Sequence, residues 1–152
     1  MSFPPPPAVA GTRLDGSAPY VIDAAENRTL CATTNVAPDP EGRAHPIYYF
    51  IATQVGMGQT VAGLCAVCDF DVNDGPMMGN TRVEFSTPLM TGQPYFVRGE
   101  IVSLVRKPSR KLGVMDVLEY RLRLDTPEGA PVLVTTNTWV LPRPRLARQG
   151  LA

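Results

Sequence analysis

The order of its apolar patterns constrains what this chain can fold into more than any single motif. Between residues 59 and 70, the side chains Val61, Leu64, Cys65 and Cys68 recur at the i, i+3, i+4, i+7 spacing of one helix face. Four runs with β-strand character follow, at residues 82–87, 95–105, 118–124 and 132–141, joined by short turns. A sheet of four such strands needs a cover for its apolar face, and this is the only long apolar helix. We therefore predict an α+β fold in which a curved antiparallel sheet of meandering strands wraps around a central apolar helix.

The length of 152 residues fits one domain with flanking segments. Residues 1–18 are rich in proline, glycine and alanine and predict a flexible arm, disordered or extended. The folded domain is expected over residues 19–142, followed by a basic C-terminal tail at 143–152. Within the domain, Asp23 and Glu26 form a capping-box pair, and Pro46 is placed to begin a helix. Two further helices are therefore predicted ahead of the apolar one.

Charge and hydropathy argue against several classes of protein. The 14 basic side chains equal the 14 acidic ones, so nothing predicts general binding to nucleic acid or to an anionic membrane. No apolar run reaches the ~18 residues that span a bilayer. The N-terminal residues lack the basic start and apolar centre of a signal peptide. We therefore expect a cytoplasmic protein.

The cysteines form one short motif, Cys65 and Cys68 in a CxxC arrangement, with Cys31 as the third. Three cysteines are too few, and odd in number, for a disulfide framework. A zinc site needs about four ligands, whereas the other candidates, Cys31 and His45, lie far off in the sequence. Because the motif falls on the apolar helix, we interpret these thiols as small hydrophobic side chains, and we predict neither a metal nor a cofactor.

Four local motifs occur in an order typical of one family. They are Pro19-Tyr20-Val21-Ile22-Asp23 ahead of a helix, His45-Pro46-Ile47-Tyr48, Gly56-Met57-Gly58, and residues 81–89 followed by Gly92. Over residues 19–142 the chain resembles the hotdog fold and, within it, the MaoC-like hydratases and dehydratases of acyl thioesters. The second motif is similar to the Asn-Pro-Ile-His catalytic loop of that family, and the third to the start of its central helix. The resemblance implies the fold predicted above, but a fold alone does not assign a reaction.

The resemblance also locates the catalytic pair, and both of its positions are substituted. In active members an Asp, with a His five positions later, acts as the general acid–base pair on the thioester. Alignment on Pro46 places Arg43 at the Asp position, Tyr48 at the His position and His45 at that of the Asn. Arginine stays protonated, and a phenol with a pKa near 10 is a poor base. His45 is the only histidine and titrates near neutrality, so catalysis by His45 and Tyr48 stays open beside a structural role.

Two sets of residues are candidate substrate contacts. Gly56 and Gly58, with Arg43 in the loop, would bring a thioester to backbone N–H groups at a helix start, where negative charge is favoured; a simple helix break is the alternative. A basic hairpin connection could bind the phosphates of coenzyme A or simply keep the end of the sheet solvated. Its residues are Arg106, Lys107, Arg110 and Lys111.

These observations favour a subunit of an acyl-thioester hydratase or dehydratase of the enoyl-CoA type, the half that lacks the Asp/His pair. Family members pair their sheets, so the resemblance implies an acyl-CoA or other acyl-thioester ligand and a homodimer or a heteromer with a second hotdog chain. Three alternatives stay open: a hotdog thioesterase, a non-catalytic acyl-CoA or small-ligand binding protein, and an enzyme with chemistry rebuilt on His45 and Tyr48. Thioesterases commonly use a helix Asp or Glu, and residues 42–68 contain neither.

Overall fold

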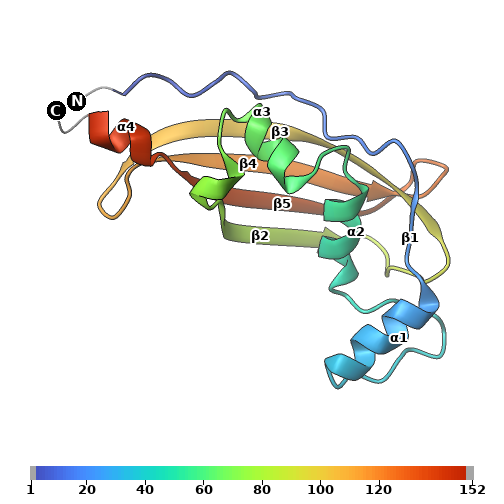
Figure 1. Cartoon of the computed structure of the whole chain (residues 1–152). Coiled ribbons are helices and arrows are strands. Elements are labelled where there is room, and N and C mark those ends of the chain that lie inside the picture. Colours follow the sequence, from blue (N-terminus) through green and yellow to red (C-terminus); the bar gives the residue numbers. More distant parts are fainter. Residues whose placement is uncertain (1–2, 150–152) are drawn as a thin grey trace.

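A curved five-stranded antiparallel sheet with helices on its inner side forms the body of the molecule in this computed structural model, which describes residues 3–149 (Figure 1). In chain order the first elements are β1 (Tyr20–Val21), α1 (Ala24–Thr33), α2 (Tyr48–Gly56), α3 (Val61–Val67) and a 3-10 turn, η1 (Val72–Asp74). The long strands follow as β2 (Met77–Phe85), β3 (Pro94–Ser109), β4 (Gly113–Asp125) and β5 (Pro131–Pro142), and α4 (Pro144–Gln149) comes last. The predicted α+β fold with a curved antiparallel sheet is confirmed.

The strand order is β1-β3-β4-β5-β2, which corrects the predicted meander. β3, β4 and β5 follow one another as expected, but β2 pairs with β5 and not with β3, the next strand along the chain. Neighbouring strands lie about 4.8 Å apart, so the eight-residue connection at 86–93 is long enough to pass the ends of β5 and β4. The connection at residues 86–93 therefore passes the ends of two strands and does not close a hairpin between β2 and β3.

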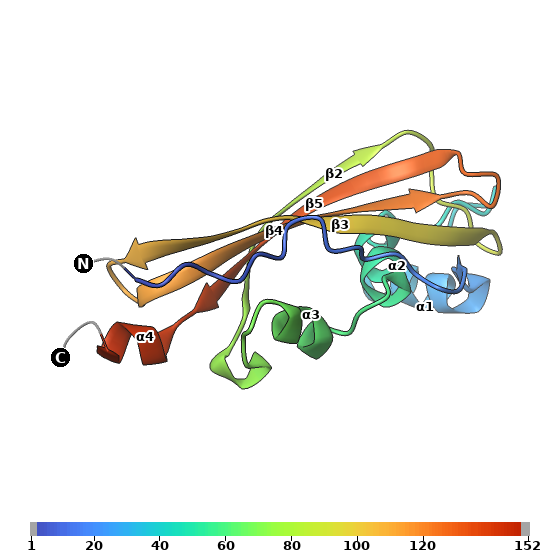
Figure 2. The ribbon, with the colours of Figure 1, turned by 90° about the horizontal axis from the view of Figure 1, so that it is seen from above.

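The core lies between the inner face of the sheet and the helices, as Figure 2 shows from above. Alternation along β4 decides which side chains face inward, and Leu118, Tyr120, Leu122 and Leu124 are all fully buried. The intervening Arg121 is exposed on the outer face. The alternation predicted from the sequence is therefore confirmed in this strand.

The apolar helix predicted at residues 59–70 is α3, which is shorter than expected, and the helix predicted to begin at Pro46 is α2. Thr60 begins α3 because its hydroxyl accepts the N–H of Gly63 at 2.9 Å, and α3 ends at Val67, before Asp69 takes a positive φ of 51°. α2 precedes it and is bent by 62° from it. Among residues 3–149 no single helix is long and apolar enough to cross a membrane, and α2 and α3 match such a span only jointly, by length and composition.

The N-terminal arm is extended and lies along β3, where a flexible segment was expected. The N–H groups of Gly11 and Leu14 donate to β3 carbonyls at 2.8 Å each, and the N–H of Gly16 donates to another at 2.9 Å. Leu14 is fully buried. The arm thus continues β1 along the outer edge of β3. The predicted basic tail forms α4; residues 1–2 of the arm and 150–152 of the tail lie outside the described residues.

Candidate functional site

The loop at residues 43–48 is fixed by two other segments of the chain. The N–H of Ala44 donates to the carbonyl of Leu89 at 2.8 Å, which ties the loop to the connection between β2 and β3. The N–H of His45 donates to Oδ1 of Asn27 at 2.8 Å. Asn27 lies on α1 and is buried, so this bond is shielded from water. The loop therefore has a defined position relative to α1 and the sheet.

His45 uses its ring to stabilise the start of α2. Its Nδ1 accepts the backbone N–H of Ile47 at 3.1 Å, and this is the only hydrogen bond of the ring within residues 3–149. Because Nδ1 is an acceptor, the neutral ring carries its proton on Nε2. The free nitrogen of His45 is then a donor and cannot take a proton from a substrate or a water. This geometry favours the structural role over general base catalysis.

Arg43 and Tyr48 face different parts of the molecule. The Arg43 side chain is 55% exposed and pairs with Glu41 at 2.8 Å and Asp39 at 3.6 Å, both in its own loop. Tyr48 is buried, and burial raises the pKa of its phenol, with the neighbouring Tyr20 adding to the shift. A phenol with a raised pKa stays protonated at neutral pH. Neither side chain is placed or charged to act as the acid–base partner of the other.

Gly56 and Gly58 do not begin a helix, so that part of the prediction is wrong. Gly56 is the last residue of α2, and α3 begins only at Val61, after the N-cap Thr60. A Cβ atom on Gly58 would lie 2.4 Å from the carbonyl oxygen of Asp15 in the arm, and one on Gly56 would lie 2.7 Å from a β3 side chain. The close approach that requires glycine is therefore made by the arm and the sheet.

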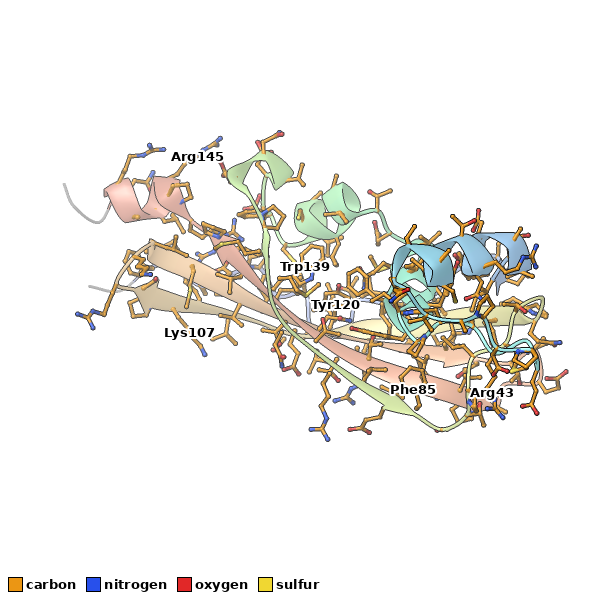
Figure 3. All side chains as sticks on the ribbon, turned by 90° about the horizontal axis from the view of Figure 1, so that it is seen from below. Arg43, Phe85, Lys107, Tyr120, Trp139 and Arg145 are labelled. Carbon is orange, nitrogen blue, oxygen red and sulfur yellow. The ribbon has the colours of Figure 1, made fainter. Side chains whose placement is uncertain are left out.

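The basic candidates lie at the opposite end of the sheet from the loop, as Lys107 and Arg43 show in Figure 3. Arg106 belongs to β3 and not to the hairpin connection, which spans only residues 110–112. Its guanidinium donates to the buried carboxylate of Asp116 at 2.7 and 2.9 Å, so it is not available to a phosphate. The other three are exposed: Lys107, Arg110 and Lys111. Within one chain, these residues and the loop do not form a single site.

An apolar groove of about 370 Å³ lies between the loop and the end of β2. Pro46, Phe85 and Leu89 contribute to its walls, and Phe85 is 46% exposed. Tyr49 of α2 meets the Phe85 ring edge-on, with 6.3 Å between ring centroids. The groove has the size and polarity to receive part of an acyl chain.

The CxxC motif is part of the core. Cys31, Cys65 and Cys68 are all buried, and burial raises the pKa of the Cys68 thiol to about 11. Burial also raises the pKa of Cys65, and thiols with a raised pKa stay protonated at neutral pH and are poor metal ligands and poor nucleophiles. Across residues 3–149, no three His, Cys, Asp or Glu side chains come together in an arrangement that could hold a metal ion.

No protein-family model and no curated protein sequence matches this chain. Solved structures do match. The chain is similar to the HadBC (3R-hydroxyacyl-ACP dehydratase) complex from Mycobacterium tuberculosis, with a TM-score of 0.68 and 13% identity over 88% of this chain and 98% of that one. The fold is the hotdog fold. The ChsH1-ChsH2 complex from the same bacterium gives a TM-score of 0.64 at 12% identity, over 86% of this chain and 83% of that one.

A third match, a MaoC-like dehydratase from Rhodospirillum rubrum, has a TM-score of 0.62 and 15% identity over 90% of this chain and 94% of that one. The predicted structural resemblance to MaoC-like dehydratases is thus confirmed. At these identities the likeness concerns the fold, and chemistry depends on the side chains present. Sequence reasoning missed Asn27, which fixes the backbone of His45, because a single inward-facing amide on a helix leaves no spacing pattern.

Proposed function

We propose that this chain is the half of an acyl-thioester hydratase or dehydratase that shapes the substrate site without supplying the acid–base pair. The observation that carries the proposal is the anchored loop at 43–48, in which Arg43 is held by carboxylates and Tyr48 is buried and protonated. Hydration requires a group that takes a proton from water. The His45 ring offers a donor on its free side, so the base has to come from a second chain.

The open edge of the sheet supports pairing with such a chain. The N-terminal arm covers β3 along one edge, whereas β2 at the other edge has a strand on one side only, in the part of the chain described. Long uncovered edge strands are templates for pairing. Large apolar side chains are exposed on β2 itself: Met77, Met78 and Phe85. Two of the similar structures, HadBC and ChsH1-ChsH2, are complexes of named pairs.

Antiparallel pairing of two β2 strands would also give the basic residues a role. β2 runs from the end of the sheet that carries the 110–112 connection toward the end that carries the 43–48 loop. A partner aligned antiparallel to β2 would place its own catalytic loop toward the basic end of this chain. Lys107, Arg110 and Lys111 would then be positioned to attract the phosphates of a coenzyme A bound at the partner's site.

The test is an assay of the purified chain alone and together with a second hotdog chain that has an intact Asp/His pair. We expect no hydration of enoyl-CoA by the chain alone and turnover by the pair. The Met78→Glu variant should weaken association about tenfold or more, because it buries a charge against the partner. Val36→Glu alters an equally exposed side chain away from β2 and should leave association unchanged. Robust hydration by the isolated chain would overturn the proposal, and release of free coenzyme A would favour a thioesterase.

A further inference from the structure

The inner face of the sheet carries a band of polar side chains where a purely apolar core is expected. Thr135 and Asn137 of β5 are both buried, and Asn137 Nδ2 donates to the Thr135 hydroxyl at 3.1 Å. The Thr81 hydroxyl of β2 donates to Asn137 Oδ1 at 3.1 Å. Tyr120 of β4 lies directly opposite Asn137 on the other side. The band thus leads from the open edge strand into the centre of the core.

The band ends at Tyr120, Gln54 and Trp139, and the last two have a buried N–H donor without a normal hydrogen bond. The Tyr120 hydroxyl donates a hydrogen bond to Gln54 Oε1 of α2 at 3.1 Å. The Tyr120 and Trp139 rings, both labelled in Figure 3, meet edge-on with 5.6 Å between their centroids. Gln54 Nε2 and Trp139 Nε1 are buried, and neither makes a hydrogen bond of normal geometry among residues 3–149, although the indole N–H lies close to the Tyr120 oxygen. Two buried N–H donors therefore lack a well-placed acceptor, which costs free energy unless something else supplies one.

Turning the amide of Gln54 around does not remove the deficit. As placed, the phenol hydrogen goes to Gln54 Oε1 and the amide nitrogen has no acceptor; with the amide reversed, the nitrogen could donate to the phenol oxygen, but the phenol hydrogen would lose Oε1. Either orientation of the amide therefore leaves at least one donor of the group without a well-placed acceptor among residues 3–149. We name this group the Gln54–Tyr120–Trp139 cluster. An acceptor atom from outside the group would complete its hydrogen bonds.

The side chains around the cluster that solvent partly reaches are Gln54 and two residues of β2. Gln54 is only half-buried overall although its Nε2 is buried, so the side chain reaches from the surface inward. Thr81 and Val83 on the inner face of β2 are also half-buried. On the side of Trp139 away from the polar band the surroundings are apolar, since Leu118 pairs with Trp139 across the strands and is fully buried. An apolar chain that carries one oxygen atom would match these apolar neighbours and supply an acceptor to the N–H donors.

We propose that the Gln54–Tyr120–Trp139 cluster binds a carbonyl or hydroxyl oxygen carried on an otherwise apolar chain that enters between α2 and β2. The inference deepens the proposed function, on which its biological meaning rests, because it selects oxygenated acyl chains over plain hydrocarbon ones. The acceptor would satisfy the orphaned donors that a hydrocarbon leaves unpaired.

The chain provides its own reporter, since Trp139 is its only tryptophan and gives one indole N–H signal in a proton–nitrogen correlation spectrum. The full-length chain is titrated with methyl hexyl ketone and, separately, with a linear octene of the same chain length that has no acceptor. We expect the ketone to move the indole N–H resonance downfield and to bind about tenfold more tightly than the octene. In Gln54→Leu this preference should fall while octene binding is kept, and the same change at the exposed Gln93 should have no effect.

Equal affinity of the chain for the ketone and the octene would overturn the proposal. An indole resonance that neither probe moves, and that shows an exchange peak with water, would also overturn it, because an ordered water would then be the acceptor. The comparison in the unmodified chain decides this even where a variant fails to fold. The probes contain no thioester, so their failure leaves the proposed subunit role standing. Conversely, enoyl-CoA hydration by the isolated chain would end the proposed role without removing the oxygen site.

Discussion

The carboxylate of Asp116 is fully buried between two guanidinium groups, and its neutralisation tests directly how the ends of this chain are held. Arg106 donates to it at 2.7 and 2.9 Å, and Arg143 donates at 2.7 Å. Arg106 also reaches the carbonyl of Pro4 in the arm at 2.6 Å, and Arg143 that of Cys68 after α3 at 2.7 Å. One carboxylate therefore connects the arm, β3, β4, the end of α3 and the segment after β5.

We expect Asp116→Asn to lower the free energy of unfolding by about 3–5 kcal/mol, because two buried cations lose their counter-charge. The arginine side chains are only 10% and 11% exposed, so water screens the loss weakly. A domain is stable by about 5–15 kcal/mol in total. At about 2–4 °C per kcal/mol for a chain of this size, the melting temperature should fall by about 6–20 °C.

Urea denaturation and thermal melting of Asp116→Asn and Glu84→Gln measure this difference. Glu84 pairs with Arg82 at 2.8 Å, but these side chains are 66% and 74% exposed, so we expect a loss within about 1 kcal/mol. Replacing Asp116, Arg106 and Arg143 together by leucine should recover much of the stability, because no unpaired charge remains. A loss for Asp116→Asn no larger than that for Glu84→Gln would refute the reasoning.

Two further substitutions test the arm and the interior. Leu14→Ala should cost about 2–5 kcal/mol in urea denaturation, because it leaves a cavity under the arm, whereas Val21→Ala, at a side chain 49% exposed, should cost much less. Burial raises the pKa of Tyr120 to about 12, against about 10 for an unfolded phenol. The fold favours the neutral phenol, so this stability is present below pH 10 and is lost as the pH rises toward 12. Phenolate absorbance followed against pH, with Tyr120→Phe for comparison, should show one tyrosine ionising only with alkaline unfolding.

The strands were predictable because their burial depends on a local period of two. In β4 the alternation of Leu118, Tyr120, Leu122 and Leu124 with charged residues decides the inward face without reference to any other strand. The neighbours of each strand are a different matter. β2 lies beside β5 because of contacts between residues some 50 positions apart, such as Thr81 with Asn137, and nothing in either segment alone indicates the other.

The contacts that the side chains of the candidate loop make could not be predicted from the sequence. The resemblance identified residues 43–48 as the loop, and the structure places them beside an apolar groove. Whether His45 can act as a base depends on the backbone N–H of Ile47, which its ring accepts. Whether Arg43 can contact a substrate depends on the carboxylates that surround its side chain. Neither contact can be read from the sequence. The glycines illustrate the same limit, since Gly58 is required by the arm, a segment whose path the sequence leaves undetermined.

The open strand β2 links the two proposals, because the polar band begins on the strand that a partner would cover. Thr81 marks the entry to the Gln54–Tyr120–Trp139 cluster and lies on β2 itself. A partner that narrows this entry would change ligand affinity, and the ligand must then change partner affinity by the same factor. Measuring ketone affinity with and without the partner, and partner affinity with and without ketone, gives two ratios that have to agree. If the two ratios agree and differ from one, ligand and partner affect each other, and β2 forms the wall between the oxygen site and the second chain. If both ratios equal one, the oxygen site and the partner surface are independent of each other.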